Sequence, residues 1–263
     1  MSYKIIEHPM SPYAQKIRIM LREKGVAFSC CQPAGVGSGN DPLLEQNPRR
    51  EVPLLQIDEI HFLYDSSVIL EYLEESIPLP SMMPNSALLK AKMRTIERVC
   101  DGHYEAINWG LIELSCFRRG GGIEATLKDA ALRDISNMHA WLQGQLGSNS
   151  WLSGEQFGWG DICAVPHVAV SSMLGVVPTS GTPLDAWWKR CLIRPAVADT
   201  IAEASATMPG LADAWQWLEQ GFSRQYRDHR LEWMIRSGGL SVVKDGLNRG
   251  NIRFTLTEEF AKT

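Results

Sequence analysis

The first eighty residues alternate between short β-rich runs and amphipathic helical patterns, and this alternation restricts the fold more than any other feature of the sequence. Residues 3–7 predict a strand, residues 12–24 predict a helix that ends at Gly25, and residues 26–31 predict a second strand. Because a β–helix–β unit with a short return favours a right-handed crossover, we expect the two strands to pair in parallel.

Two further strands and a helix complete this N-terminal unit. Residues 52–57 and 60–64 predict strands joined by the turn at Asp58 and Glu59. Residues 66–75 predict a helix, because valine, isoleucine, tyrosine and leucine side chains recur there with helical spacing. The sum is a small α+β domain with its own core, which we place at residues 1–77.

The segment between the second and third strands contains three glycines within residues 34–40, followed by a short helical pattern at residues 41–46. The glycine spacing is not G-x-G-x-x-G, and the glycines follow the second strand rather than the first. We therefore predict a flexible loop there and no nucleotide-binding turn.

The chain changes character after a proline-containing linker at residues 77–84. Residues 85–263 predict an all-helical domain with an extended C-terminal tail and no strand before that tail. Its helical patterns cover residues 88–117, 123–146, 161–175, 184–192, 195–206, 211–220 and 240–247. Residues 223–236 are rich in charged side chains, which we expect to form a solvated or inter-element face rather than a functional site.

Composition excludes several classes of protein. The 263 residues carry a net charge of −4 and are 44% hydrophobic, which argues against a broad nucleic-acid or anionic-membrane surface. No apolar run is long enough to span a bilayer, and residues 1–4 lack the apolar core of a signal peptide, so we expect a cytoplasmic protein. The six cysteines are scattered, without C-x-x-C spacing, so we expect neither a metal site nor a disulfide framework.

Ser11 is the first candidate for chemistry. It precedes Pro12, a residue favoured at the first position of a helix, so its hydroxyl is predicted to cap that helix among free backbone N–H groups. The positive end of a helix dipole stabilises an anion, particularly a thiolate. A plain helix cap is the alternative reading. His8 lies nearby in the sequence and is expected to have a structural role in the turn.

Two later features supply further parts of a ligand site. Pro53 stands at the start of a strand, where a cis Val52–Pro53 bond would turn the backbone N–H and C=O of Val52 outward to pair with an extended peptide. Asp65 and Ser66 stand at the mouth of the next helix, where free N–H groups and a hydroxyl form a carboxylate pocket. The Asp65 carboxylate there is suited to a ligand ammonium group.

In order and at these spacings, the motifs resemble the glutathione S-transferase superfamily, in particular its serine-type members. The sharpest are the runs at residues 11–18, 47–54, 65–73 and 194–197, and the resemblance spans about residues 3–220. It implies a thioredoxin-like N-terminal domain, an all-α C-terminal domain, glutathione as co-substrate and a homodimer.

Site residues carry over from the family position by position. Ser11 falls where serine-type transferases keep the hydroxyl that hydrogen-bonds the glutathione thiol. The resemblance implies that Val52 pairs with the cysteinyl unit beside Pro53, and that Asp65 and Ser66 bind the γ-glutamyl end. Arg50 occupies a position where some classes bind the glycyl carboxylate.

The second substrate is expected between the domains, over Met10, Tyr13 and the inner face of the long helix at Tyr104, Asn108 and Trp109. An aromatic, apolar pocket favours a hydrophobic electrophile. The leading prediction is a glutathione transferase. A glutathione-dependent lyase, isomerase or β-etherase acting on an aromatic substrate is one alternative, since the tail is loosely similar to those of bacterial members with such activities. A non-catalytic binding or scaffold protein is the other.

Overall fold

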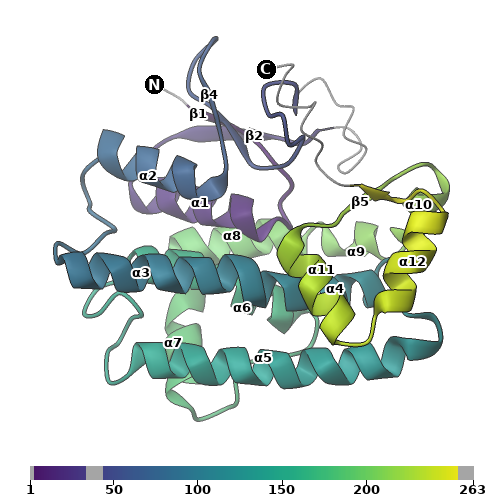
Figure 1. Ribbon diagram of the computed structural model, residues 1–263. Coiled ribbons are helices and arrows are strands. Elements are labelled where there is room, and N and C mark those ends of the chain that lie inside the picture. The colour runs from purple at the N-terminus through teal and green to yellow at the C-terminus, as the bar shows by residue number, and fades with distance from the viewer. Residues whose placement is uncertain (1–2, 34–43, 254–263) are drawn as a thin grey trace.

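The computed structural model describes residues 3–33 and 44–253, so the predicted glycine-rich loop and the first half of the short helix after it lie outside the described residues. The N-terminal unit contains a four-stranded sheet of order β2-β1-β3-β4, with α1 lying between the sheet and the helices of the second part (Figure 1). Its elements are β1 (Tyr3–Ile6), α1 (Pro12–Glu23), β2 (Phe28–Cys31), β3 (Leu54–Gln56), β4 (Phe62–Tyr64) and α2 (Ser66–Ser76).

The pairing of the strands follows the predicted topology. β1 and β2 are parallel, with Ile5 opposite Cys30, whereas β3 runs antiparallel to both β1 and β4. The parallel pair confirms the expected crossover through α1. Ile5 and Leu55 face each other across the sheet and are fully buried, as is Ile17 of α1. Their burial fixes the face of the sheet that α1 covers.

The second part is helical, as predicted, and its first helical pattern is one continuous rod. A π-helical turn (Cys100–Tyr104) joins α3 (Ala87–Val99) to α4 (Glu105–Ser115). The helices that follow are α5 (Glu124–Leu146) after a 3-10 turn (Gly121–Ile123), α6 (Trp159–Met173), α7 (Pro183–Leu192), α8 (Pro195–Ser205), α9 (Met208–Leu211), α10 (Trp215–Glu219), α11 (Asp228–Arg236) and α12 (Leu240–Asn248).

Two details of the second part differ from the prediction. Within residues 211–220, where one helix was expected, the structure has only the last residue of α9, a turn and the short helix α10. The all-helical expectation also misses a two-residue parallel pair formed by β5 (Arg224–Gln225) and β6 (Ile252–Arg253). These strands are far apart in sequence, so no local pattern announces their pairing.

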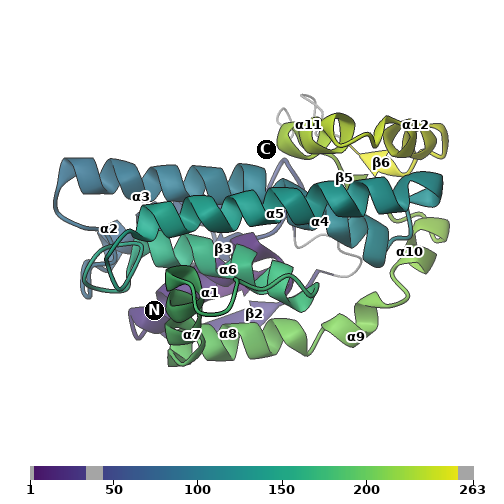
Figure 2. The same cartoon turned by 90° about the horizontal axis from the view of Figure 1, so that it is seen from below.

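The C-terminal segment, residues 223–253, packs on the outer side of α4. α11 packs against α4, and α11 and α12 lie on the side of α4 and α5 opposite to α8 and α9 (Figure 2). Gly110 of α4 permits this close approach, because a Cβ at that position would lie 2.1 Å from the Trp233 ring of α11. Within the described residues, no helix is long and apolar enough to cross a membrane.

A buried ionic network holds the two parts together. Lys16 of α1 is fully buried and its Nζ lies 2.9 Å from Glu97 and 2.5 Å from Asp101, across the boundary between the parts. Glu97 also accepts hydrogen bonds from the Ser67 hydroxyl at 2.7 Å and the Trp159 indole at 2.8 Å. The network therefore fixes α1 and the start of α2 against α3 and α6.

Candidate functional site

Ser11 is the N-cap of α1, as predicted. Its backbone is extended, Pro12 is the first helical residue, and the Ser11 Oγ accepts a hydrogen bond from the Ala14 N–H at 3.4 Å. The half-buried side chain lines a cavity of about 230 Å³. His8 stabilises the preceding turn, since its Nδ1 accepts the Met10 N–H at 3.2 Å. The backbone therefore places the serine hydroxyl at the positive end of α1.

The cavity beside Ser11 is largely apolar and aromatic, and is called here the apolar cavity. It is bounded by α1, by α4 and by the C-terminal segment. Met10, Tyr13, Asn108 and Trp109, four of the five residues predicted for a second substrate, line it. Its remaining apolar wall consists of Leu44, Ile112, Phe117, Val170, Leu211, Trp217 and Phe222.

Tyr104 is the exception, and its predicted place in the pocket is wrong. The side chain is fully buried in the helical core, with its hydroxyl 2.7 Å from His139 Nε2 and 2.8 Å from Ser171 Oγ. Tyr104 is the last residue of the π-helical turn, which changes the angular spacing of side chains along the rod. The Tyr104 side chain therefore faces the helical core and not the cavity.

A second cavity of about 420 Å³, called here the polar cavity, lies at the mouth of α2. Val52, Pro53, Asp65 and Ser66 line it, and the Val52–Pro53 peptide bond is cis, as predicted. No hydrogen bond between described residues uses the Val52 backbone. Asp65 caps α2 by accepting the Ser67 N–H at 3.0 Å, and its φ of 72° is a left-handed conformation rare for a residue with a Cβ.

The two cavities adjoin. Tyr13, Glu51, Val52 and Arg227 line both of them. Burial is the main reason that the pKa of Tyr13 is raised well above its usual value, and its hydroxyl donates to the Asp101 carbonyl at 2.8 Å. The phenol is therefore neutral and already engaged, which leaves Ser11 as the side chain suited to an anionic sulfur.

Arg50 was predicted as the basic residue of this region, but its neighbour Arg49 is the one that lines the polar cavity. Arg50 lines the apolar cavity, whereas Arg49 lines the polar one. The Arg49 side chain lies 3.1 Å from Glu51 and 3.5 Å from Asp65. Two adjacent arginines in a turn give no sequence signal that tells which one faces the site.

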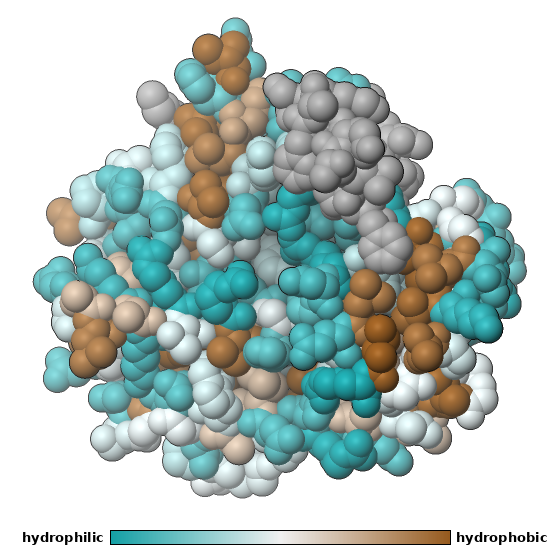
Figure 3. Space-filling model, viewed as in Figure 1, coloured by the Kyte–Doolittle hydropathy of each residue, from teal (hydrophilic) through white to brown (hydrophobic). Residues whose placement is uncertain are grey.

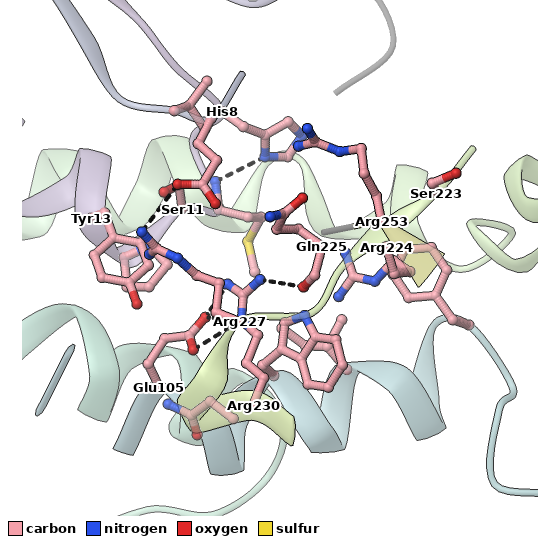
Figure 4. Close-up of a pocket in the computed structure, with 18 of the residues that line it drawn as sticks. His8, Ser11, Tyr13, Glu105, Ser223, Arg224, Gln225, Arg227, Arg230 and Arg253 are labelled. Atoms are coloured by element: carbon pink, nitrogen blue, oxygen red, sulfur yellow. Dashed lines mark hydrogen bonds and ion pairs between the residues drawn. The ribbon is translucent and has the colours of Figure 1, made fainter. Parts of the chain in front are cut away.

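The C-terminal segment also lines the apolar cavity, although no residue of it was predicted to do so. Figure 4 shows the side chains of Arg224, Arg227, Arg230 and Arg253 around one space, with Ser11 and His8 at its edge. The expectation of an inter-element face is confirmed, because Arg230 pairs with Glu105 of α4 at 2.5 Å and Arg227 with Glu51 at 3.1 Å. The same face also lines the apolar cavity, which the sequence pattern did not predict. The recurrence of arginine every three residues was the available signal.

These ion pairs set the protonation of the acids behind the cavity. Burial alone would raise the pKa of Glu105, but the Arg230 charge and the hydrogen bonds from His229 and Arg230 lower it to about 2. His229 Nε2 lies 3.0 Å from the same carboxylate. Glu105 is therefore an anion that anchors α11, and not a proton donor.

Comparison with known proteins identifies the family of this chain. The family models "Glutathione S-transferase, N-terminal domain" and "Glutathione S-transferase, C-terminal domain" match residues 5–81 and 103–195. Together they cover more than half of the chain, which therefore belongs to the glutathione S-transferase superfamily. The superfamily resemblance and the fold class predicted from the sequence are both confirmed. Glutathione is the co-substrate of this superfamily.

Individual relatives show the same fold and differ in their activities. A maleylacetoacetate isomerase from Pseudomonas aeruginosa is 27% identical over 190 residues, which is 70% of this chain and 85% of the relative. Glutathione S-transferase GstB from Escherichia coli is 26% identical over 163 residues, 60% of this chain and 76% of the relative. The crystal structure of a Methylobacterium radiotolerans glutathione S-transferase in complex with glutathione sulfonate is 28% identical, with a TM-score of 0.66 over 76% of this chain and 95% of that one.

Proposed function

We propose that this chain is a glutathione transferase that joins the glutathione thiolate to an apolar electrophile. One observation carries the proposal: a polar cavity at the mouth of α2 adjoins an apolar cavity lined by the N-cap of α1. The first has the groups that a peptide with charged ends requires, and the second has space and apolar walls for another molecule.

Glutathione then spans the two cavities. Its γ-glutamyl ammonium pairs with Asp65, and the adjacent carboxylate accepts hydrogen bonds from Ser66 and the N-terminus of α2. The cysteinyl unit pairs with the Val52 backbone beside Pro53. A guanidinium of Arg49 or Arg50 binds the glycyl carboxylate. This order points the thiol toward Ser11.

Ser11 lowers the pKa of the bound thiol in this proposal. Its hydroxyl donates to the thiolate, and the N-terminus of α1 adds a favourable potential. One neutral hydrogen bond contributes about 0.5–1.5 kcal/mol, or about one pKa unit. Ser11 acts as a donor and not as a base, and the helix supplies the rest of the shift.

Isomerisation is the second candidate reaction, because a maleylacetoacetate isomerase is among the similar proteins. It starts from the same thiolate, which adds to the substrate and then leaves again. A glutathione-dependent lyase or β-etherase, and a non-catalytic scaffold, are the remaining alternatives. We also propose a cytoplasmic homodimer, as is general in the family, and light scattering of the purified chain tests the dimer.

A binding experiment tests the proposed site. We expect glutathione to raise the melting temperature of the full chain, and Ser66→Ala to weaken this effect, because Ser66 lines the polar cavity. The control is Ser76→Ala, at the exposed end of the same helix. Absence of any glutathione effect would support the scaffold. Mass spectrometry of mixtures with aryl halides, epoxides, aryl ethers and maleyl compounds then separates conjugation, cleavage and isomerisation.

A further inference from the structure

The C-terminal segment contributes largely buried arginine side chains to the lining of the apolar cavity. The Arg230 side chain is 13% exposed and the Arg224 side chain 16% exposed, although arginine usually lies at the surface. Ile235, Leu240 and Leu247 of the same segment are exposed, and Figure 3 shows a hydrophobic patch over the region of α11 and α12. The segment thus turns arginines inward while it leaves aliphatic side chains in solvent.

The carboxylates near these arginines are fewer than the cationic side chains that they contact. Each of three carboxylates is shared between two side chains that are or can become cationic. These sets are Glu51 with Arg49 and Arg227, Glu105 with Arg230 and His229, and Glu113 with Arg119 and Arg224. Arg50 also lines the cavity, and no carboxylate among the described residues pairs with its guanidinium. Within the described part of the chain, this cavity therefore carries an excess of positive charge.

Aromatic side chains in the cavity wall contact two of the arginines. The Arg224 guanidinium lies 4.1 Å from the centre of the Phe117 ring and 5.4 Å from that of Trp109. Arg230 lies 5.3 Å from the centre of the Trp109 ring. Low-dielectric walls strengthen the field of these charges inside the cavity. A ligand with an apolar ring and an anionic group matches both halves of this lining.

Unsatisfied polar atoms in the same lining provide a second observation. Trp109 is 4% exposed, and its indole Nε1–H has no hydrogen-bond partner among the described residues. Asn108 Oδ1 is also buried, and no described residue donates a hydrogen bond to it. Buried donors normally find acceptors, so an unpaired indole N–H in a cationic cavity favours a ligand oxygen. The volume of about 230 Å³ suits a single substituted ring, since a cavity of about 150 Å³ accommodates benzene.

We propose that the second substrate is a single-ring aromatic compound that carries a carboxylate, which the arginines of the C-terminal segment bind. The inference rests on the proposed transferase function and narrows its substrate class from apolar electrophiles to anionic aryl electrophiles. Arg224 is the arginine best suited to a test, because it lines the apolar cavity and not the polar one. It should therefore contact the second substrate and not glutathione. A planar guanidinium can bind a carboxylate through two parallel hydrogen bonds.

The test is calorimetric binding of two unreactive probes to the full chain: 3,5-dinitrobenzoate and its uncharged methyl ester. We expect the carboxylate to bind at least about tenfold more tightly than the ester, as one charge-assisted hydrogen bond predicts. Arg224→Gln is expected to remove most of this preference and Arg224→Lys to retain part of it. The control is Arg249→Gln, because the Arg249 side chain is 69% exposed and, among the described residues, forms an ion pair with Asp245 alone.

Three results would overturn the inference. They are equal or weaker binding of the carboxylate, equal effects of Arg224→Gln and Arg249→Gln, and competition between 3,5-dinitrobenzoate and S-methylglutathione. Competition would mean that the arginines serve glutathione itself. Failure of glutathione to stabilise the chain is a separate result, which would remove the transferase reaction and leave the measured preference of the cavity intact.

Discussion

At the residue scale, the Ser11 hydroxyl has two separable roles. A lone pair accepts the Ala14 N–H and caps α1, whereas the hydroxyl proton remains available for a second partner. Capping and thiolate binding therefore do not compete for the same part of the group. The hydroxyl of the buried Tyr104 and the half-buried His139 ring form a hydrogen-bonded pair, and neither residue lines either cavity.

The lowered pKa of His139 predicts that the folded chain loses stability in acid. Burial lowers its pKa from 6.5 to about 4, so the unfolded chain binds the proton more tightly than the folded chain between these values. Its contribution is present above about pH 6.5 and is lost as the pH falls toward about 4. After allowance for solvent screening, we expect a loss of about 1–2 kcal/mol. Urea unfolding of wild type and His139→Gln at both ends of this range measures it.

His139→Gln should flatten the fall in unfolding free energy with decreasing pH. His103→Gln serves as the control, because the His103 side chain is exposed and makes no hydrogen bond to another described residue. Identical pH profiles for wild type and His139→Gln would contradict the assignment.

The positions of individual side chains relative to the cavities were the hardest feature to predict from the sequence. The sequence placed Ser11, Val52, Pro53, Asp65 and Ser66 at two helix mouths and one strand entry, because caps and prolines act locally. It did not separate Arg49 from Arg50 or remove Tyr104 from the pocket. Those outcomes depend on a turn with a left-handed residue and on a π-helical turn, which leave no local pattern.

At the element scale, the packing of α11 on α4 determines the shape of the apolar cavity. Gly110 is in contact with the Trp233 ring, and the Trp233 indole donates to Asp134 of α5 at 2.9 Å. α11 carries Arg230, and the short strand before it carries Arg224, so this packing also positions the cationic side chains. Helical spacing predicted the helices of the second part, but their mutual packing depends on contacts distant in sequence.

Gly110→Ala should therefore disturb the C-terminal segment. A Cβ cannot fit 2.1 Å from the Trp233 ring, so α11 must shift. Overpacking of this kind costs about 1–3 kcal/mol. We expect lower stability in urea and faster proteolysis within residues 223–253. Gly144→Ala is the matched control on α5, because nothing lies within 4 Å of the added Cβ and alanine favours a helix. Equal stability of both variants would exclude this packing role.

At the scale of the whole molecule, buried charges join the two parts of the chain and the C-terminal segment bounds the site from outside. The change from alternating strands and helices to helices alone was visible in the sequence, and so was the superfamily. The charged run at residues 223–236 was visible too, but the sequence did not show that its arginine side chains face the cavity. A run of charged residues usually indicates a solvent-exposed face. Here the pairing of β5 with β6 and the packing of α11 on α4 direct the arginine side chains toward the cavity.

Lys16 tests how strongly the two parts depend on each other. Lys16→Met leaves the carboxylates of Glu97 and Asp101 buried without their shared cation, which costs about 3–5 kcal/mol. Urea unfolding measures the loss, with Lys90→Met at an exposed position of α3 as the control. Partial recovery in a variant that also carries Glu97→Gln and Asp101→Asn would assign the loss to unpaired charge. A fully stable Lys16→Met protein would contradict the account.

The central claim is that Ser11 stabilises the thiolate of bound glutathione, and an ultraviolet titration of that thiolate tests it most directly. In the wild-type protein we expect a thiol pKa well below that of free glutathione, and in Ser11→Ala a pKa about one unit higher. Thr182→Ala removes a similar cap, the Asp185 N–H to Thr182 Oγ1 hydrogen bond of 3.2 Å on α7, and should leave the thiol unchanged. The same thiol pKa in wild type and Ser11→Ala would contradict the claim.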